Sequence, residues 1–237
     1  MELSPDSTIF WQSGEVKLNA TIALTWLNML LLTLGAALVT RRLRDDERLS
    51  RWQNLLEVLV GGIERQIADM GLKPPREFLP FLGTLFIFVL FSNLLAIVPG
   101  YRPPTGSLST TAALAISVFI AVPWWGIRRR GLRGFFGLYI KPSVFMLPFN
   151  ILGELSRTLA LAVRLFGNIM SGSMIAGILL SVAPLFFPVA MQLLGLITGV
   201  IQAYIFAILA AVYIAAAVKV QQVREDAEPL PEGGIHG

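Results

Sequence analysis

Long apolar runs separated by short polar segments dominate this chain. Five of these runs are as long as the roughly 17–25 residues that a helix needs to cross a membrane. Charged residues gather in the short segments between the runs, as they do in loops outside a bilayer. The pattern predicts an all-α membrane protein with a single integral domain covering residues 1–237. The predicted crossings are residues 19–39, 78–98, 108–125, 145–182 and 189–220.

Residues 48–70 follow a different pattern from the crossings. Apolar residues recur every three or four positions, while charged residues interrupt any spanning run. This periodicity predicts an amphipathic helix lying in the cytoplasmic membrane interface. Packing of this helix against another subunit is an alternative, and both can hold. The apolar face consists of Leu49, Trp52, Leu56, Leu59, Ile63 and Ile67.

Positive charge predicts the orientation of the chain. Of the 19 Lys and Arg residues, 15 fall in segments that five crossings place on one side, which the positive-inside rule assigns to the cytoplasm. These segments are residues 41–51, 65–76, 128–141 and 219–224. We therefore expect an external N-terminus over residues 1–18 and a cytoplasmic C-terminus. The tail over residues 225–237 is rich in Pro, Gly and acidic residues, which predicts a flexible segment.

Composition narrows the possible functions. Only 14% of the residues are charged, against about 25% in soluble proteins. The net charge of +4 lies in short clusters between apolar runs, so it does not indicate nucleic-acid binding. Cysteine is absent, and the single histidine, His236, is next to the last residue. The sequence therefore predicts no metal, no cofactor and no cysteine or histidine catalysis.

A polar stripe interrupts the fourth predicted crossing. Its members are three or four residues apart, so they share one face of a helix over roughly 25 Å. Arginine cannot escape burial by losing its proton, and a charge at membrane depth costs several kcal/mol. We interpret the stripe as one wall of an ion path. The alternative interpretation is that both arginines extend their side chains to the membrane surface near a helix end. This alternative suits Arg157 better than Arg164. The face consists of Glu154, Arg157, Leu161, Arg164, Asn168 and Ser171.

The last predicted crossing has a matching face, and the two form a hairpin over residues 145–222. Glycine and glutamine on one face permit close helix approach and supply hydrogen bonds inside a membrane. We expect Gln202 and Asn168 to hydrate and orient Arg164. Simple contact between helices is the alternative for Gln192 and Gln202. This face consists of Gln192, Gly195, Gly199, Gln202 and Phe206.

Three short blocks resemble subunit a of the F-type ATP synthases. Arg164-Leu-Phe-Gly-Asn168 resembles the family signature, and Gln202-Ala-Tyr-Ile-Phe206 with Val212-Tyr213 resembles its last helix. Asn93-Leu-Leu with Pro99 and Pro104-Thr105 resembles its second helix and the following loop. Order and spacing agree over roughly residues 78–220.

The resemblance implies a non-catalytic stator subunit in a bacterial plasma membrane. Its implied partners are the ring of c subunits, b-type peripheral stalk subunits and the lipid membrane. Arg164 would lie between two ion half-paths, one from each side, and would favour the ionised form of a carboxylate on the ring. Passage of H⁺ or Na⁺ would then drive ring rotation, while ATP synthesis or hydrolysis would occur on the soluble sector.

The sequence departs from the family pattern where acidic or histidine residues are usual. Ser173 and Gly195 occupy two such positions, and the outer loop reads Pro104-Thr-Gly-Ser107 without the usual aspartate. Glu154 is one substitute, placed on the inner side. The other account is a path for Na⁺, because the run Glu154-Leu-Ser-Arg-Thr-Leu resembles the sodium-linked branch called N-type. The choice between H⁺ and Na⁺ stays open.

Two other classes of protein remain as alternatives. A secondary transporter could use an intramembrane arginine to bind an anionic substrate, but that class favours internal repeats, and we find none. An intramembrane enzyme would need a Ser–His or paired-Asp site, and no His or Asp lies within a predicted crossing.

Overall fold

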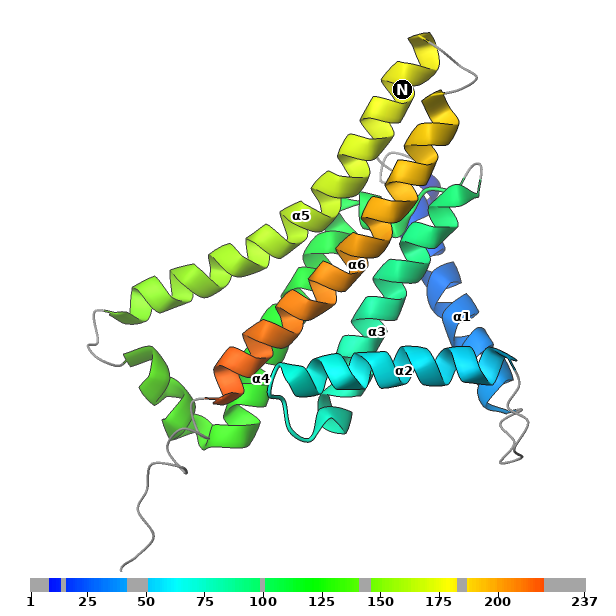
Figure 1. Cartoon of the computed structure of the whole chain (residues 1–237). Coiled ribbons are helices and arrows are strands. Elements are labelled where there is room, and N and C mark those ends of the chain that lie inside the picture. Colours follow the sequence, from blue (N-terminus) through cyan, green and yellow to red (C-terminus); the bar gives the residue numbers. More distant parts are fainter. Residues whose placement is uncertain are drawn as a thin grey trace, which may run out of the picture.

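The computed structural model describes residues 9–13, 16–41, 51–98, 101–140, 146–182 and 187–219, and these are almost entirely helical (Figure 1). Five helices contain stretches long and apolar enough to cross a membrane, namely Thr21–Leu38, Pro75–Ile97, Leu108–Arg129, Pro148–Leu179 and Val189–Val218. This confirms the all-α membrane fold. The helices are α1 (Ala20–Thr40), α2 (Arg51–Asp69), α3 (Pro75–Leu94), α4 (Leu108–Ile140), α5 (Met146–Val182) and α6 (Phe187–Lys219).

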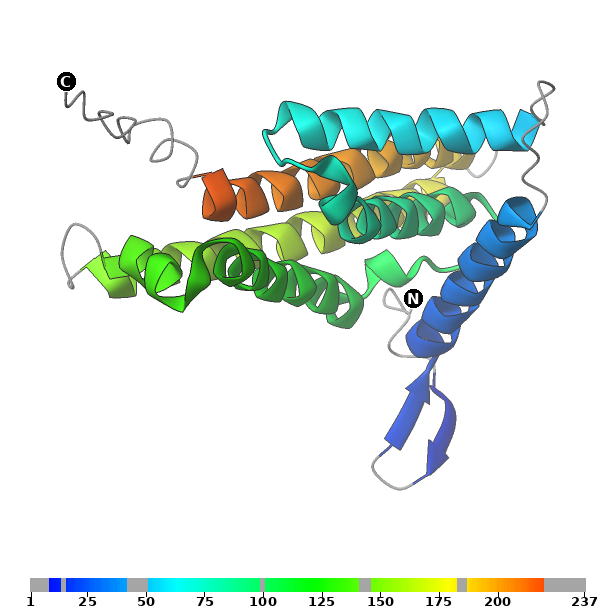
Figure 2. The same cartoon turned by 90° about the horizontal axis from the view of Figure 1, so that it is seen from below.

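A short antiparallel β-hairpin precedes α1 and was not predicted. It pairs β1 (Ile9–Ser13) with β2 (Val16–Asn19), largely within the segment expected to form the external N-terminus. Aromatic and β-branched residues favour strands, and β1 contains Ile9, Phe10 and Trp11, whereas β2 contains only Val16. A hairpin this short is marginal by itself, which explains why its sequence signal is weak. It projects from the start of α1 (Figure 2).

Helices α3, α4, α5 and α6 enclose the core. Fully buried side chains come from each of them, including Phe78, Val89, Val118, Leu165 and Phe206. Helices α5 and α6 run side by side as an antiparallel hairpin, as predicted (Figure 1). At 37 residues α5 is about 55 Å long, well beyond a hydrocarbon core of roughly 30 Å, so it must tilt if its whole length lies within the bilayer.

Helix α2 crosses α3 and α6 instead of running beside them (Figure 1). Its predicted apolar face packs inward, with Ile67 buried and Ile63 against the core. Residues 42–50, including Leu49 of that face, lie outside the described residues. The amphipathic helix is therefore confirmed from Arg51, and its partner is the same chain. Its location in the membrane interface remains a prediction.

Helix α4 continues beyond its predicted end at residue 125. The predicted basic loop is helical as far as Ile140, with one break at Gly131, where φ is +71°. Glycine adopts this left-handed region without the steric cost that a Cβ imposes. Before the break, Glu77 of α3 pairs with both Arg128 and Arg129 of α4. These pairs hold the two helices together at the end predicted to be cytoplasmic.

A polar network attaches α1 to the rest of the molecule. Asn28 of α1 is fully buried and donates from Nδ2 to Ser92 Oγ of α3 at 2.8 Å. The Tyr101 hydroxyl, in the loop after α3, donates to Asn28 Oδ1 at 2.8 Å. The other faces of α1 are mostly exposed, including Trp26 and Leu30. One buried amide therefore supplies much of the contact that fixes α1 to α3.

This network predicts an unusual titration for Tyr101. Burial raises its pKa to about 12, although the hydrogen bond with Asn28 acts in the opposite direction. The pKa of Tyr101 in the folded protein lies above the ordinary 10.0. The contribution of its buried, neutral hydroxyl to the free energy of unfolding is therefore fully present below about pH 10 and is lost as the pH rises through 12. Tyrosinate absorbance should therefore show a step near pH 12 that Tyr101→Phe removes. If Tyr101→Phe instead removes a step near pH 10.0, the burial argument is wrong.

Candidate functional site

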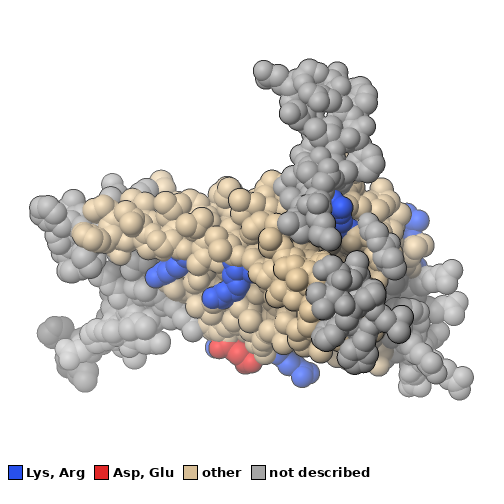
Figure 3. Space-filling model, turned by 90° about the horizontal axis from the view of Figure 1, so that it is seen from above, with Lys and Arg blue, Asp and Glu red and all other residues tan. Residues whose placement is uncertain are grey.

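Arg164 lies on the outward face of α5. Its neighbours Leu161 and Leu165 are buried in the core, whereas Leu159 and Val163 on its other side are 64% and 53% exposed. Arg164 is itself exposed, and its side chain has no ion-pair or hydrogen-bond partner among the described residues. Positive charge forms only small separate patches on the face seen in Figure 3. A permanent charge therefore stands beside apolar side chains on a helix long enough to cross a membrane.

Helix α5 is continuous through the predicted polar face, although Leu161 of that face is buried in the core. Asn168 is half-buried one turn beyond Arg164, and Ser171 and Ser173 are exposed beyond it. The Ser173 hydroxyl donates to the Met170 carbonyl at 2.8 Å. Its oxygen can still accept one further hydrogen bond. The stretch after Arg164 thus presents amide and hydroxyl groups, and no acid.

Glu154 and Arg157 form an ion pair one turn apart on α5. Arg157 Nη1 lies 3.6 Å from Glu154 Oε2, and the Glu154 side chain is only 13% exposed. The guanidinium group also lies over the Tyr213 ring of α6, 5.7 Å from its centre. Such cation–π contacts add about 0.5–1 kcal/mol at exposed sites. Arg157 therefore connects α5 with α6 near the C-terminal end of α6.

Gln202 faces inward from α6. The residue is 7% exposed, and its Nε2 is buried without a hydrogen-bond partner in the described structure. No direct hydrogen bond joins it, or Asn168, to Arg164 within the described residues. A buried donor without a partner costs about 1–3 kcal/mol. Orientation of Arg164 by Gln202 and Asn168 therefore stays a prediction, and no direct hydrogen bond within the described residues supports it.

Gln192 makes a contact that fits the alternative given for it. Its Nε2 donates to the Ile97 carbonyl at 3.0 Å, in the short 3₁₀ helix η2 (Leu95–Ile97) that follows α3. This hydrogen bond joins α6 to the end of α3. Gln192 therefore acts at least as a contact between helices.

Sequence reasoning missed the closest polar contact between α3 and α6. Asn93 is buried and donates from Nδ2 to the Gly199 carbonyl at 2.8 Å. Its Oδ1 accepts a hydrogen bond from Thr105 at 2.9 Å. A Cβ on Gly199 would lie 2.9 Å from the Asn93 Cβ, so this crossing requires glycine. Two signals in the sequence could have indicated this contact. They are Gly199 on the predicted face of the last crossing and the amide of Asn93 at the end of an apolar run.

The outer loop approaches α5 close to the polar face. Its 3₁₀ helix η3 (Pro104–Gly106) is buried. A Cβ on Gly106 would lie 3.0 Å from Cγ2 of Ile169, the residue after Asn168. Together with Asn93, this loop brings hydroxyl and amide groups near the part of the hairpin that follows Arg164.

Known proteins match this chain over most of its length. The family model of the ATP synthase A chain matches residues 22–215. ATP synthase subunit a of Albidiferax ferrireducens is 59% identical over 234 residues, 99% of both chains. ATP synthase subunit a 2 of Acaryochloris marina and subunit a 1 of Chlorobium luteolum are each 62% identical over 222 residues, which is 94% of this chain and 95% and 100% of theirs.

These matches cover α5 and α6 of the hairpin and the Asn93 contacts that join α6 to α3. They do not support a secondary transporter, the alternative given above. Arg164, Asn168 and Gln202, which carried the resemblance, all lie within the matched residues. The chain belongs to the ATP synthase A chain family, the subunit a of F-type ATP synthases.

Proposed function

We propose that this subunit forms two ion half-paths against a ring of c subunits and couples passage of H⁺ or Na⁺ to rotation of that ring. Arg164 carries the proposal, because it is exposed on a membrane-length apolar helix and its side chain has no partner among the described residues. A charge in that position needs a counter-charge from another molecule. A carboxylate on each passing c subunit would supply it.

Arg164 would act through its permanent charge. The guanidinium group favours the ionised form of an approaching carboxylate, so the ion bound to that carboxylate is released. Because arginine does not deprotonate in proteins, it also blocks direct movement of ions between the half-paths. The subunit breaks and forms no covalent bond, and nucleotide chemistry belongs to the soluble sector.

The two ends of the hairpin would serve the two sides of the membrane. Glu154 with Arg157 would line the inner half-path, where Glu154 provides a carboxylate. Asn168, Ser171 and Ser173 would line the outer half-path with oxygen and amide groups. Such a lining suits water-borne protons and hydrated Na⁺ alike.

The proposed setting follows from charge and family membership. The protein is a multi-pass membrane subunit of an ATP synthase, and we place it in a bacterial plasma membrane with the N-terminus outside and the C-terminus in the cytoplasm. Besides the c-ring, b-type peripheral stalk subunits would contact it. The exposed apolar faces of α1 and α5 leave room for lipid and for these partners.

The orientation can be tested with fused reporters. We predict that reporters placed after Arg44, Arg133 and Arg224 are cytoplasmic, because these positions follow the basic clusters. A reporter after Arg102 should be external. An external reporter at Arg133 would contradict the five-crossing arrangement, whatever the function of the hairpin.

The Glu154–Arg157 pair predicts partial compensation. Glu154→Gln leaves Arg157 without its partner, and we expect a roughly two- to fivefold loss of coupled transport, since partly exposed pairs contribute about 0.2–1 kcal/mol. Glu154→Gln with Arg157→Gln should lose less, because neither charge is then unpaired. Transport is measured in vesicles with equal amounts of assembled complex. A double variant no better than the single one would refute the pairing of Glu154 with Arg157.

Arg164 predicts the largest effect in the chain. Arg164→Gln should lower ion-coupled ATP synthesis and ion pumping by at least about two orders of magnitude, as loss of one charge-stabilising group does in enzymes, while the complex still assembles. Arg164→Lys should restore little, because its compact ammonium group cannot reproduce the forked guanidinium. Arg157→Gln is the matched control on the same helix and should be much milder.

The measurement uses vesicles in which Na⁺ is varied at fixed pH, so that it also identifies the ion. Near-normal coupled transport in Arg164→Gln would overturn the proposed mechanism. Loss of assembly alone would leave the rate per assembled complex unchanged, and the comparison at equal complex separates the two effects.

A further inference from the structure

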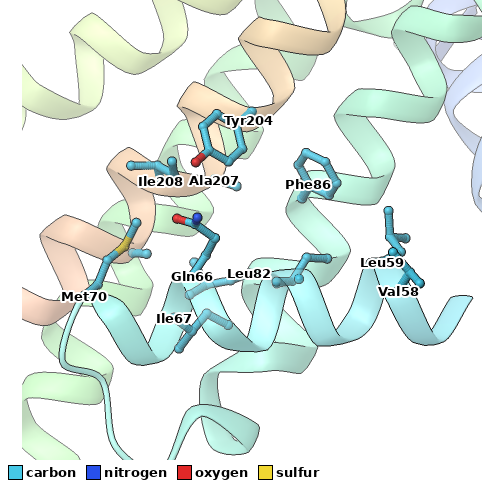
Figure 4. Close-up of a pocket in the computed structure, with 13 residues that line it drawn as sticks. Val58, Leu59, Gln66, Ile67, Met70, Leu82, Phe86, Tyr204, Ala207 and Ile208 are labelled. Atoms are coloured by element: carbon cyan, nitrogen blue, oxygen red, sulfur yellow. The ribbon is translucent and has the colours of Figure 1, made fainter.

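An apolar pocket lies between the crossing helix α2 and the two core helices α3 and α6. Its volume is about 380 Å³. Helix α2 forms its floor, with Leu82 and Phe86 of α3 and Tyr204 and Ala207 of α6 forming the walls (Figure 4). The pocket is separate from Arg164, which does not line it.

Small residues create this pocket. Gly62 on α2 and Ala207 and Ala211 on α6 all line it. A Cβ built on Gly62 would meet nothing within 4 Å. The space therefore exists because larger side chains are missing from the α2 floor and from the α6 wall. Apolar atoms that line such a space forfeit dispersion contacts unless something fills it.

Only two of the lining residues carry polar side chains. Gln66 extends from α2 in the direction of Tyr204 of α6 (Figure 4). Neither side chain has a hydrogen-bond partner within the described part of the chain. The occupant that fits is therefore an apolar body with one hydrogen-bonding group.

The position of the pocket identifies that occupant. Helices α3 and α6 carry membrane-length apolar stretches, and an amphipathic helix such as α2 lies at the boundary between headgroups and acyl chains. The glycerol esters of phospholipids lie at this same depth. A pocket of about 380 Å³ is near the lower limit of ligand pockets, about 300–1,000 Å³.

We propose that this pocket retains one acyl chain of a membrane phospholipid, with the ester carbonyl accepting a hydrogen bond from Gln66 or Tyr204. The chain replaces side chains that Gly62, Ala207 and Ala211 do not supply. The lipid would fix the angle at which α2 crosses α3 and α6. The proposal rests on α2 lying in the membrane interface and does not depend on the role of Arg164.

The test uses the assembled complex in vesicles that contain a phospholipid with a photoactivatable diazirine midway along one acyl chain. After illumination, labelled peptides are identified by mass spectrometry. We expect labelling of the α2 and α6 segments that line the pocket. Gly62→Leu should lower this labelling at least fivefold, because its side chain occupies the pocket. Ala207→Leu should lower it from the opposite wall.

The adjacent glycine supplies a matched control. Gly61 is on the same helix, has the same open space around an added Cβ, and does not line the pocket. Gly61→Leu carries the same change in helix propensity and should leave the labelling unchanged. Equal labelling in Gly61→Leu and Gly62→Leu would overturn the proposal, as would a wild-type protein in which these segments are not labelled above the rest of the lipid-facing surface.

Two further comparisons identify the ligand and separate the proposals. A free fatty acid with the same diazirine should label the pocket at least fivefold less than the phospholipid, and equal labelling would refute the phospholipid. Gln66→Leu together with Tyr204→Phe should weaken retention of the phospholipid while keeping the pocket apolar. Arg164→Gln should leave the labelling unchanged, so that failure of the ion-path mechanism and failure of the lipid site give different results.

Discussion

The structure depends on how each polar side chain at membrane depth finds a partner. A polar group in hydrocarbon costs several kcal/mol when it is left alone. Asn28 and Asn93 meet this requirement inside the chain, with Ser92, Tyr101, Thr105 and the Gly199 carbonyl. Arg164 faces outward between apolar residues and has no such partner in the part of the chain that the structure describes. The cost of an unpartnered polar group therefore has two consequences. The buried amides hold the bundle together, and Arg164 requires a partner from another molecule.

Two sets of contacts hold the α5–α6 hairpin, one on each side of Arg164. Asn93 fixes α6 to α3 through Gly199, where the missing side chain permits the close approach. Toward the other end, Arg157 lies between Glu154 of its own helix and the Tyr213 ring of α6. A hairpin held at two separate heights keeps the intervening stretch of α5 in a fixed position. On the proposed mechanism, a rotating partner then passes a charge whose location does not change.

Hydropathy was sufficient to predict the membrane-length helices, because apolar length is a property of neighbouring residues. It could not predict the Asn93–Gly199 contact, whose residues are 106 positions apart. The continuation of α4 was also missed, since a basic cluster marks the end of a membrane crossing without ending the helix. The sequence also did not show that the Gln202 amide is buried, with Nε2 lacking a partner in the described structure. Side-chain direction follows from packing, which one sequence does not reveal.

The loop predicted to be outer shows how packing bears on the choice of ion. The family resemblance leads one to expect an aspartate near Gly106, but a Cβ at this position would lie 3.0 Å from Cγ2 of Ile169 of α5. The loop therefore packs against α5 more closely than a larger side chain would permit without movement. The groups around it are the Asn93 amide and the Thr105 hydroxyl, which do not titrate in the physiological range. On the proposed mechanism, protons or Na⁺ must then cross the outer half-path by water and oxygen contacts alone. Titration would be confined to Glu154 and the carboxylate of the ring.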